Sequence, residues 1–373
     1  MIGFGVLTAG VCGSGVLAQE GFDNDHGYML IGDPGNRATE GDEIAFPLTF
    51  PIGNVDHEFR LAKLEMTLRK QVEFVEAYSP IYFKNNPTLS QARNEFSGWD
   101  LEVRPGSVVL TGRSLDIAGT MGWEYAARYI NWLHHGKVNE EWAFETGVYD
   151  TSTFGCVEIP CNYPATHTPE ARYWIPSLNE WVKAAHWDPD KDGGAGGYWI
   201  YPNRTNEALR AELLPEDGGQ RNAGLGTEIS FPLDVGSFPS EASPWGILDL
   251  AGGEAEWLEN FANVPSQTSH RRGLDGTDWL TTSYNYPYDP FLDDYDQWNW
   301  FTGRGVFTAF GIRIARMADD PADIDQNGKT NWFDVSEFLN RFLVDDLSVD
   351  FRADGVLDAD DVLVFLGLFE QVK

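Results

Sequence analysis

Oxygen-bearing side chains recur at fixed spacing near the C-terminal end of this 373-residue chain. In one twelve-residue stretch they occupy positions 1, 3, 5, 9 and 12, with glycine at position 6 and a lysine carbonyl at position 7: Asp323, Asp325, Asn327, Gly328, Lys329, Asn331 and Asp334. Calcium takes about six to eight oxygen ligands, and this spacing wraps them round one ion while the glycine makes the sharp turn. The stretch predicts a calcium-binding loop.

A second loop follows 27 residues later, where Asp350 matches Asp323. Its expected ligands are four carboxylates and one carbonyl, that of the valine: Asp350, Asp354, Val356, Asp358 and Asp361. Position 3 differs, because Arg352 brings a cation in place of an oxygen. We expect either a weaker second site or an ion pair of Arg352 in place of one ligand. A solvated acidic turn is the alternative for a single loop, but two loops in register favour two calcium ions.

Each loop precedes a short apolar pattern at i, i+3, i+4 and i+7, which is typical of an amphipathic helix. Two loop–helix repeats with Asp at position 12 resemble the dockerin module, here over 323–373. The resemblance implies a small all-α module that docks a cohesin-like partner through solvent-facing helix residues. The candidates for this contact are Ser336, Glu337, Asn340, Val364 and Gly367. Self-association or a stabilising role is equally open.

Charge and composition exclude several classes of protein. The chain holds 58 acidic and 26 basic residues, for a net charge of -32, and 42% of its residues are hydrophobic. Global disorder does not fit this content of apolar residues. Phosphate backbones and anionic lipid surfaces would be repelled, so we expect neither nucleic acid nor a membrane surface as a partner. A solvated acidic surface accounts for the charge without a specific role.

The N-terminal 18 residues are apolar and end in small residues before the first charge at Glu20. This pattern is typical of a signal peptide, here 1–18, with cleavage after Ala18. A buried first strand is the alternative. No other segment reaches the roughly 20 apolar residues that span a bilayer. We therefore expect a secreted or cell-surface protein without a membrane span.

The chain has three cysteines, of which Cys156 and Cys161 lie close together in a loop-like segment. In an oxidising compartment such a pair most simply forms a disulfide. A metal-binding or redox pair is the alternative, but no histidine lies nearby in the sequence. We therefore predict a disulfide between them.

Three segments between residues 27 and 316 have the periodicity of amphipathic helices: 67–78, which opens with a Thr cap, 123–133 and 177–186. The remainder alternates short strand patterns with Gly, Pro and Asn turns. This order predicts a loop-rich α+β fold. A short polar connector at 317–322 marks the boundary with the C-terminal module.

Several motifs of this region, in this order, resemble the formylglycine-generating enzyme family, also called the sulfatase-modifying factor domain. They include Tyr-Trp-Ile-Pro-Ser-Leu-Asn-Glu-Trp at 173–181, Ser-Pro-Trp-Gly-Ile-Leu-Asp-Leu-Ala-Gly at 243–252, Glu-Trp at 256–257 and Phe-Gly-Ile-Arg at 310–313. The resemblance covers nearly all of 27–316. It implies a C-type-lectin-like fold, in which two helices lie beside small twisted antiparallel sheets.

The resemblance also implies which chemistry to look for. Active family members oxidise a sulfatase cysteine with a copper ion held by two cysteines shortly before the closing Gly-Phe-Arg. Residues 296–311, the matching stretch, hold no cysteine. Soft thiolates suit Cu(I), so we expect catalysis to be lost. The alternative is an oxidoreductase of the formylglycine-generating type, or a diverged relative.

One or more structural calcium ions are also implied for this region, through Asn222 and Glu256. Gly253 stands where the family usually has Asn, and turn capping by both residues is the alternative.

Aromatic residues crowd the segment 279–300, among Asn and Asp. The candidate ligand surface comprises Tyr284, Tyr286, Trp298 and Trp300. Flat aromatic rings with polar neighbours suit recognition of a glycan or a protein, although half of them filling the core is an equal alternative. The sequence thus predicts a secreted, non-catalytic binding protein that is anchored or assembled through its calcium module.

Overall fold

The structure is a computed structural model of the chain. It describes residues 27–40, 43, 51–85, 101–110, 114–152, 154, 164–169, 171–207, 209–210, 212, 215–220, 233–252, 254, 256–261, 272–275, 310–318, 322–324, 330–352 and 356–371. The signal-peptide prediction for 1–18 lies outside these residues.

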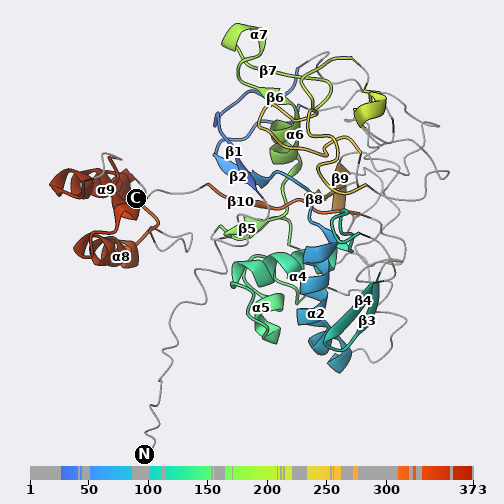
Figure 1. Cartoon of the computed structure of the whole chain (residues 1–373), viewed down its shortest axis with the longest axis horizontal. Coiled ribbons are helices and arrows are strands. Elements are labelled where there is room, and N and C mark those ends of the chain that lie inside the picture. Colours follow the sequence, from blue (N-terminus) through green and yellow to red (C-terminus); the bar gives the residue numbers. More distant parts are fainter. Residues whose placement is uncertain are drawn as a thin grey trace, which may run out of the picture.

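A four-stranded antiparallel sheet joins segments from both ends of the larger region (Figure 1). Its order is β1 (Tyr28–Ile31), β2 (Phe59–Ala62), β10 (Ala315–Met317) and β5 (Tyr173–Trp174). Strand β10 lies between β2 and β5, and its first residue pairs with Leu61 on one side and with Trp174 on the other. Because β10 begins at residue 315, the sheet cannot be complete until almost the whole larger region is present.

Three helices predicted from periodicity are present. They are α2 (Leu68–Asn85), α4 (Trp123–His134) and α6 (Leu178–His186). Helix α6 starts with a capping box, in which the Ser177 hydroxyl accepts from the Glu180 N–H while the Glu180 carboxylate accepts from the Ser177 N–H. Helix α2 runs past the predicted end at residue 78, although Pro80 lies inside it. The buried ring of Tyr82 explains the extension, because packing outweighs the local preference against proline.

Aromatic rings join α2 to α4. Phe74 contacts Tyr129 and Trp132, with ring centroids 5.4 and 6.1 Å apart. The short helix α5 (Glu141–Glu145) adds Phe144, whose ring stacks on Trp132 at 6.1 Å. Offset and edge-on contacts of this kind contribute beyond the apolar area they bury. Figure 1 shows α2, α4 and α5 on the same side of the central sheet.

The remaining strands form three two-stranded antiparallel sheets. Their members are β3 (Leu101–Arg104) with β4 (Ser107–Leu110), β6 (Trp187–Asp188) with β7 (Gly197–Tyr198), and β8 (Glu256–Phe261) with β9 (Arg272–Asp275). Two single turns of helix, α7 (Lys191–Gly194) and η2 (Pro215–Asp217), lie in the connections. The described residues therefore confirm a loop-rich α+β fold.

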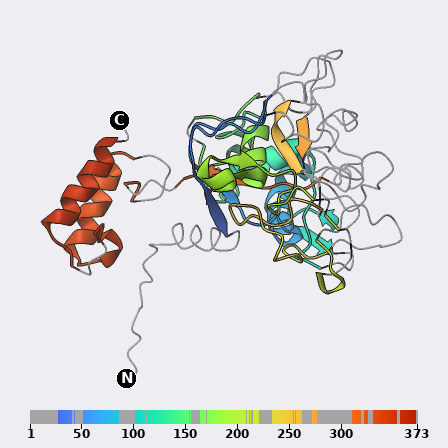
Figure 2. The ribbon, with the colours of Figure 1, turned by 90° about the horizontal axis from the view of Figure 1, so that it is seen from above.

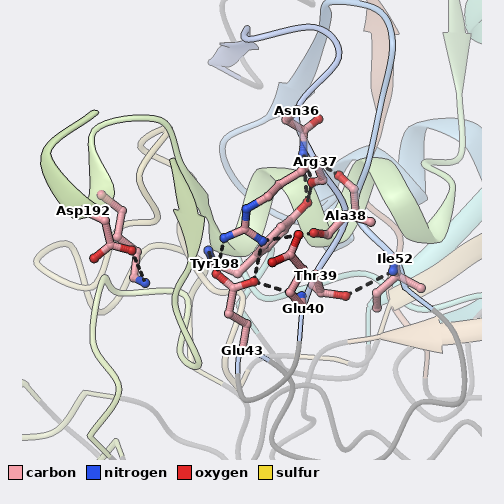
Figure 3. Close-up of polar contacts among 11 residues, drawn as sticks. Asn36, Arg37, Ala38, Thr39, Glu40, Glu43, Ile52, Asp192 and Tyr198 are labelled. Carbon is pink, nitrogen blue, oxygen red and sulfur yellow. Dashed lines mark hydrogen bonds and ion pairs between the residues drawn. The ribbon is translucent and has the colours of Figure 1, made fainter. Parts of the chain in front are cut away.

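Side-chain contacts hold the loop after β1 against β7, as Figure 3 shows. Arg37 makes a bidentate ion pair with Glu43, with both N–O distances at 2.6 Å, and Glu43 also accepts from the Tyr198 N–H. The Tyr198 hydroxyl donates to the Arg37 carbonyl. Gly53 has a φ of +89°, and a Cβ there would lie 2.5 Å from the Tyr198 hydroxyl oxygen, so only glycine fits.

The C-terminal residues form a second, separate hydrophobic cluster. Helices α8 (Trp332–Leu343) and α9 (Ala359–Gln371) lie side by side, with η3 (Leu347–Val349) between them in the sequence (Figures 1 and 2). Both helices match the periodicity of the repeat. The buried residues of this cluster are Ala322, Ile324, Phe338, Val349, Phe365 and Phe369. Throughout the described parts of the chain, no helix combines the length and hydropathy needed to cross a bilayer.

Candidate functional site

The two C-terminal repeats meet at equivalent residues. Phe338 and Phe365, which a shift of 27 residues superposes in sequence, stack with ring centroids 4.2 Å apart and planes at 2°. The contact is buried and joins α8 to α9 directly. Stacking at this position brings the two loop–helix repeats into one small unit with a shared core.

The predicted ligands at positions 9 and 12 also cap the helices. In the first repeat Asn331 Oδ1 accepts from the Phe333 N–H at 2.9 Å, and Asp334 Oδ2 accepts from the Asn331 N–H at 2.7 Å. In the second repeat, Asp358 and Asp361 make the equivalent two bonds, at 2.8 and 2.9 Å. Each of these carboxylates uses one oxygen for a cap and retains a second oxygen for other contacts.

The described residues cover only part of each predicted ligand set. In the first loop they include Asp323, Asn331 and the buried Asp334, whereas Asp325, Asn327 and Lys329 lie outside them. In the second loop Asp354 lies outside them. Among the residues that can be placed, no three His, Cys, Asp or Glu side chains converge closely enough to hold a metal ion. Two bound calcium ions therefore stay a prediction, which rests on the hard oxygen donors of the loops.

Arg352 occupies the second loop as a cation. Its Nη1 lies 2.9 Å from Asp360 Oδ2 and 4.0 Å from Asp358 Oδ1. The Arg352 N–H also donates to Asp361 Oδ1 at 3.1 Å. Asp361 accepts from the main-chain N–H groups of Asp358 and Arg352, and these hydrogen bonds lower its pKa. Arg352 therefore forms an ion pair with Asp360. Aligning the two repeats could have suggested this partner, because Asp360 stands where the first repeat has the uncharged Phe333.

Large apolar side chains face solvent on this helix pair. Trp332 and Phe333 are each 75% exposed, Leu343 is 79% exposed, and Leu363 on α9 is 66% exposed. Sequence reasoning selected other positions. Of these, Ser336, Asn340, Val364 and Gly367 are exposed, whereas Glu337 is half-buried and pairs with Arg341 at 2.9 Å. A helical wheel would have revealed the exposed apolar residues, because α8 is apolar on more than one face.

Glu256, predicted as a calcium ligand of the larger region, lies at the start of β8 and is buried. Its carboxylate is 2.7 Å from Arg313 Nη2 and accepts from the Trp181 indole N–H at 2.6 Å. Arg313 also donates to the carbonyls of Ala62 and Leu248. These partners occupy both oxygens of Glu256, an arrangement that does not favour metal binding. Asn222 lies outside the described residues.

Further carboxylates surround this ion pair. Burial raises the pKa of Glu65 well above its usual value, with Glu256 and Asp249 adding to the shift. Burial likewise raises the pKa of Asp249. Arg313 opposes both shifts as a cation. We interpret the group as a structural connection among the segments around β2, β8 and β10, because Glu65, Glu256 and Arg313 are buried.

Two histidines pair with buried carboxylates near Trp174. His167 Nδ1 lies 2.8 Å from Glu259 Oε1, and its ring stacks on Trp174. His57 Nε2 lies 3.0 Å from Glu180 Oε1, which also accepts from the Trp174 indole N–H. Burial opposes protonation of His167, but hydrogen bonding and attraction to Glu259 together raise its pKa. Sequence gave no signal for these pairs, because 92 and 123 residues separate the partners.

One small pocket, which is partly open to solvent, lies beside Asp249 and has a cavity volume of about 10 Å³. Its polar lining includes Asn203, Gln220, Glu241 and Asp249. Asn203 and Gln220 both donate to Glu241 Oε2, at 2.6 and 3.2 Å. Pockets for drug-sized ligands hold roughly 300–1,000 Å³. The space is therefore too small for such a ligand.

The other predicted sites lie outside the described residues. These are the disulfide between Cys156 and Cys161 and the ligand surface of Tyr284, Tyr286, Trp298 and Trp300. Both stay predictions.

Comparison with known proteins gives a distant likeness. No model of a protein family matches the sequence, and no curated protein matches it. Among solved structures, the chain is similar to the crystal structure of CarF, with 15% identity and a TM-score of 0.42 over 78% of this chain and 98% of that one. It is also similar to Treponema denticola variable protein 1, with 14% identity and a TM-score of 0.43 over 78% and 95% of the chains. Likeness at this level assigns no activity to this chain.

Proposed function

We propose that this chain is a secreted, non-catalytic protein of the sulfatase-modifying-factor type. Its larger, lectin-like region binds a glycan or protein ligand, and its dockerin-like C-terminal repeat anchors or assembles it in a calcium-dependent way. The observation that carries the proposal is the duplicated loop–helix unit. Its repeats pack through Phe338 and Phe365 while large apolar side chains remain at the surface.

The exposed side chains support docking for a physical reason. Leaving Trp332, Phe333 and Leu343 in water is unfavourable, and a protein partner that covered them would remove that cost. Aromatic residues are also enriched among the residues that dominate binding energy. The helix pair therefore has apolar anchors that its own small core does not use.

Binding of the full chain to a panel of purified cohesin modules, with calcium and with chelator, tests docking. We expect binding with calcium that falls at least tenfold in Leu343→Glu, because a charge would replace an exposed apolar anchor. Val109→Glu, an exposed valine on β4, is the matched control and should bind normally. Sedimentation of the full chain distinguishes self-association. The docking role would be abandoned if calcium changed neither cohesin binding nor the sedimentation coefficient.

The ligand surface is tested on a glycan array and against secreted proteins of known identity. Trp298→Ala should abolish binding while leaving the thermal unfolding of the chain unchanged. A uniformly negative array would restrict the proposal to protein ligands.

The alternative, an oxidoreductase of the formylglycine-generating type, requires a copper centre. Metal analysis combined with a sulfatase-peptide oxidation assay separates the two functions. One equivalent of copper that is lost in Cys156→Ser, together with oxidation of the peptide, would replace our proposal with the enzyme.

A further inference from the structure

The two C-terminal repeats differ at a coupled pair of positions. Where the first repeat has Asp325 and Phe333, the second has Arg352 and Asp360. The two replacements are partners, since Arg352 Nη1 and Asp360 Oδ2 are 2.9 Å apart. Asp325 is an acid and Phe333 is uncharged, so these two positions of the first repeat cannot form the same ion pair. The second repeat therefore carries a cation at position 3 together with an anion that pairs with it.

We propose that Arg352 is a built-in cation of the second loop, so that the first loop takes calcium while the second keeps its structure without it. This inference rests on the proposed calcium-dependent function and assigns the two loops different roles in it. Position 3 of such a loop normally contributes an oxygen to the ion. A guanidinium stays protonated in proteins and has no acceptor, so at this position it repels a divalent cation instead of binding it.

The hydrogen bonds of the second loop show what Arg352 stabilises. Its main-chain N–H donates to Asp361, and its guanidinium lies 4.0 Å from Asp358 as well as beside Asp360. The other oxygen of Asp361 accepts from the Asp358 N–H, so this carboxylate joins the two described parts of the loop. Arg352 is the only basic residue among the described residues of this loop, 350–352 and 356–361. The positive charge of Arg352 offsets the mutual repulsion of these carboxylates, which in a calcium-binding loop the ion would offset.

The helix that follows is held by the same residues. Asp358 and Asp361 cap the start of α9, through bonds to the N–H groups of Asp360 and Asp358 respectively. A loop that keeps these carboxylates in place also keeps the cap. We therefore expect α9 to remain helical in chelator, while the first loop and the start of α8 loosen.

Equilibrium dialysis of the full chain against calcium measures the two loops separately. Asp323→Ala blocks the first loop and Asp350→Ala the second. The double variant gives the background from the larger region. We expect the first loop to half-saturate at a free calcium concentration at least tenfold below that of the second. Asp323 and Asp350 are chosen because neither makes the helix-capping bonds described above.

The charge of Arg352 is tested within the Asp323→Ala background. Arg352→Asp restores an oxygen at position 3 and should tighten calcium binding by the second loop at least tenfold. Arg352→Gln, which removes only the charge, gives a smaller gain and replaces the first variant if it does not fold. Arg352→Lys is the matched control that keeps the charge, and it should leave the second loop weak. Hydrogen exchange of α9 in chelator provides a readout independent of calcium binding, and protection should fall in Arg352→Gln.

Two results would overturn the inference: equal affinities of the two loops in the natural chain, or unchanged binding in Arg352→Asp and Arg352→Gln. Either leaves the proposed calcium-dependent function intact. If neither loop binds calcium above the background of the Asp323→Ala/Asp350→Ala variant, the proposed calcium function itself fails.

Discussion

The larger region and the C-terminal repeat differ in how much of their apolar surface they bury. The larger core encloses whole tryptophans, such as Trp181 and Trp257, together with the charged side chain of Arg313. The C-terminal repeat buries six apolar residues together with the carboxylates of Asp334 and Asp361, and it leaves Trp332 and Leu343 mostly in water. Small units rarely gain enough stability from their own core and rely on metals or partners. We therefore expect the repeat to depend more than the larger region does on a bound ion or partner for its stability.

The largest expected effect is on the ion pair of the larger region. Arg313→Ala would leave Glu256 buried without its cation, which should lower the free energy of unfolding by about 3–5 kcal/mol. Denaturant unfolding followed by near-UV circular dichroism measures the change. Arg69→Ala removes an exposed partner of Asp116 and is the matched control, with an expected loss of about 0–1 kcal/mol. Equal losses in the two variants would contradict internal stabilisation by the buried pair.

The contact between the repeats gives the next effect. Phe365→Ala removes the ring that stacks on Phe338 and should cost about 3 kcal/mol, enough to unfold a unit with so small a core. Hydrogen exchange should then lose protection in α8 and α9 while that of α4 is unchanged. Leu363→Ala, a largely exposed neighbour, should cost less than about 0.5 kcal/mol. Loss of protection in α4 would mean that the two cores unfold together.

Acid should affect the larger region through His186. Burial lowers the pKa of His186 to about 3, whereas the unfolded chain has a histidine pKa of about 6.5. The unfolded state therefore binds the proton first as pH falls below about 6.5, and stability decreases by about 1.4 kcal/mol per pH unit. At pH 4.5 the loss should reach about 2–3 kcal/mol.

The variant His186→Gln keeps a donor for the Trp199 carbonyl but does not titrate. The difference in its unfolding free energy between pH 6.5 and pH 4.5 should be smaller by that amount. A variant with the same acid sensitivity as the natural chain would show that His186 is not the group responsible.

The smallest effect has the opposite sign and concerns His167. Its folded-state pKa is raised by Glu259, so its stabilising contribution is complete below the unfolded-state pKa of about 6.5. That contribution is lost as pH rises through the higher folded-state pKa. His167→Gln should remove this pH dependence and cost about 1 kcal/mol at pH 6. An unchanged slope of unfolding free energy against pH would exclude the pair as a source of it.

Periodicity and capping were enough to predict several elements. Ser177 and Glu180 are three residues apart, so the capping box of α6 was visible in the sequence. The repeat predicted α8 and α9 because each is a local apolar pattern. The end of α2 was not predicted. Tyr82 packs in the core against residues that are distant in the sequence, and this packing stabilises the helix beyond residue 78.

The candidate site likewise has features that the sequence predicted and features that it did not. The spacing of the acidic loops and the departure at Arg352 could be read directly. The partner of Arg352 was not identified, although it is only eight residues away, because a loop allows many directions for a side chain. Residues Trp332 and Leu343 lie in the predicted helix, but their exposure depends on how little core the repeat has to cover them.

The sequence by itself determined the two loop–helix repeats, three helices of the larger region and the acidic character of the chain, because each depends on spacing or composition within a short stretch. Only the tertiary structure decided that Glu256 is bound to Arg313, that His167 meets Glu259 and that β10 lies between β2 and β5. These contacts join residues that are tens to hundreds of positions apart. Local preference does not encode them, since they form only when the whole core packs.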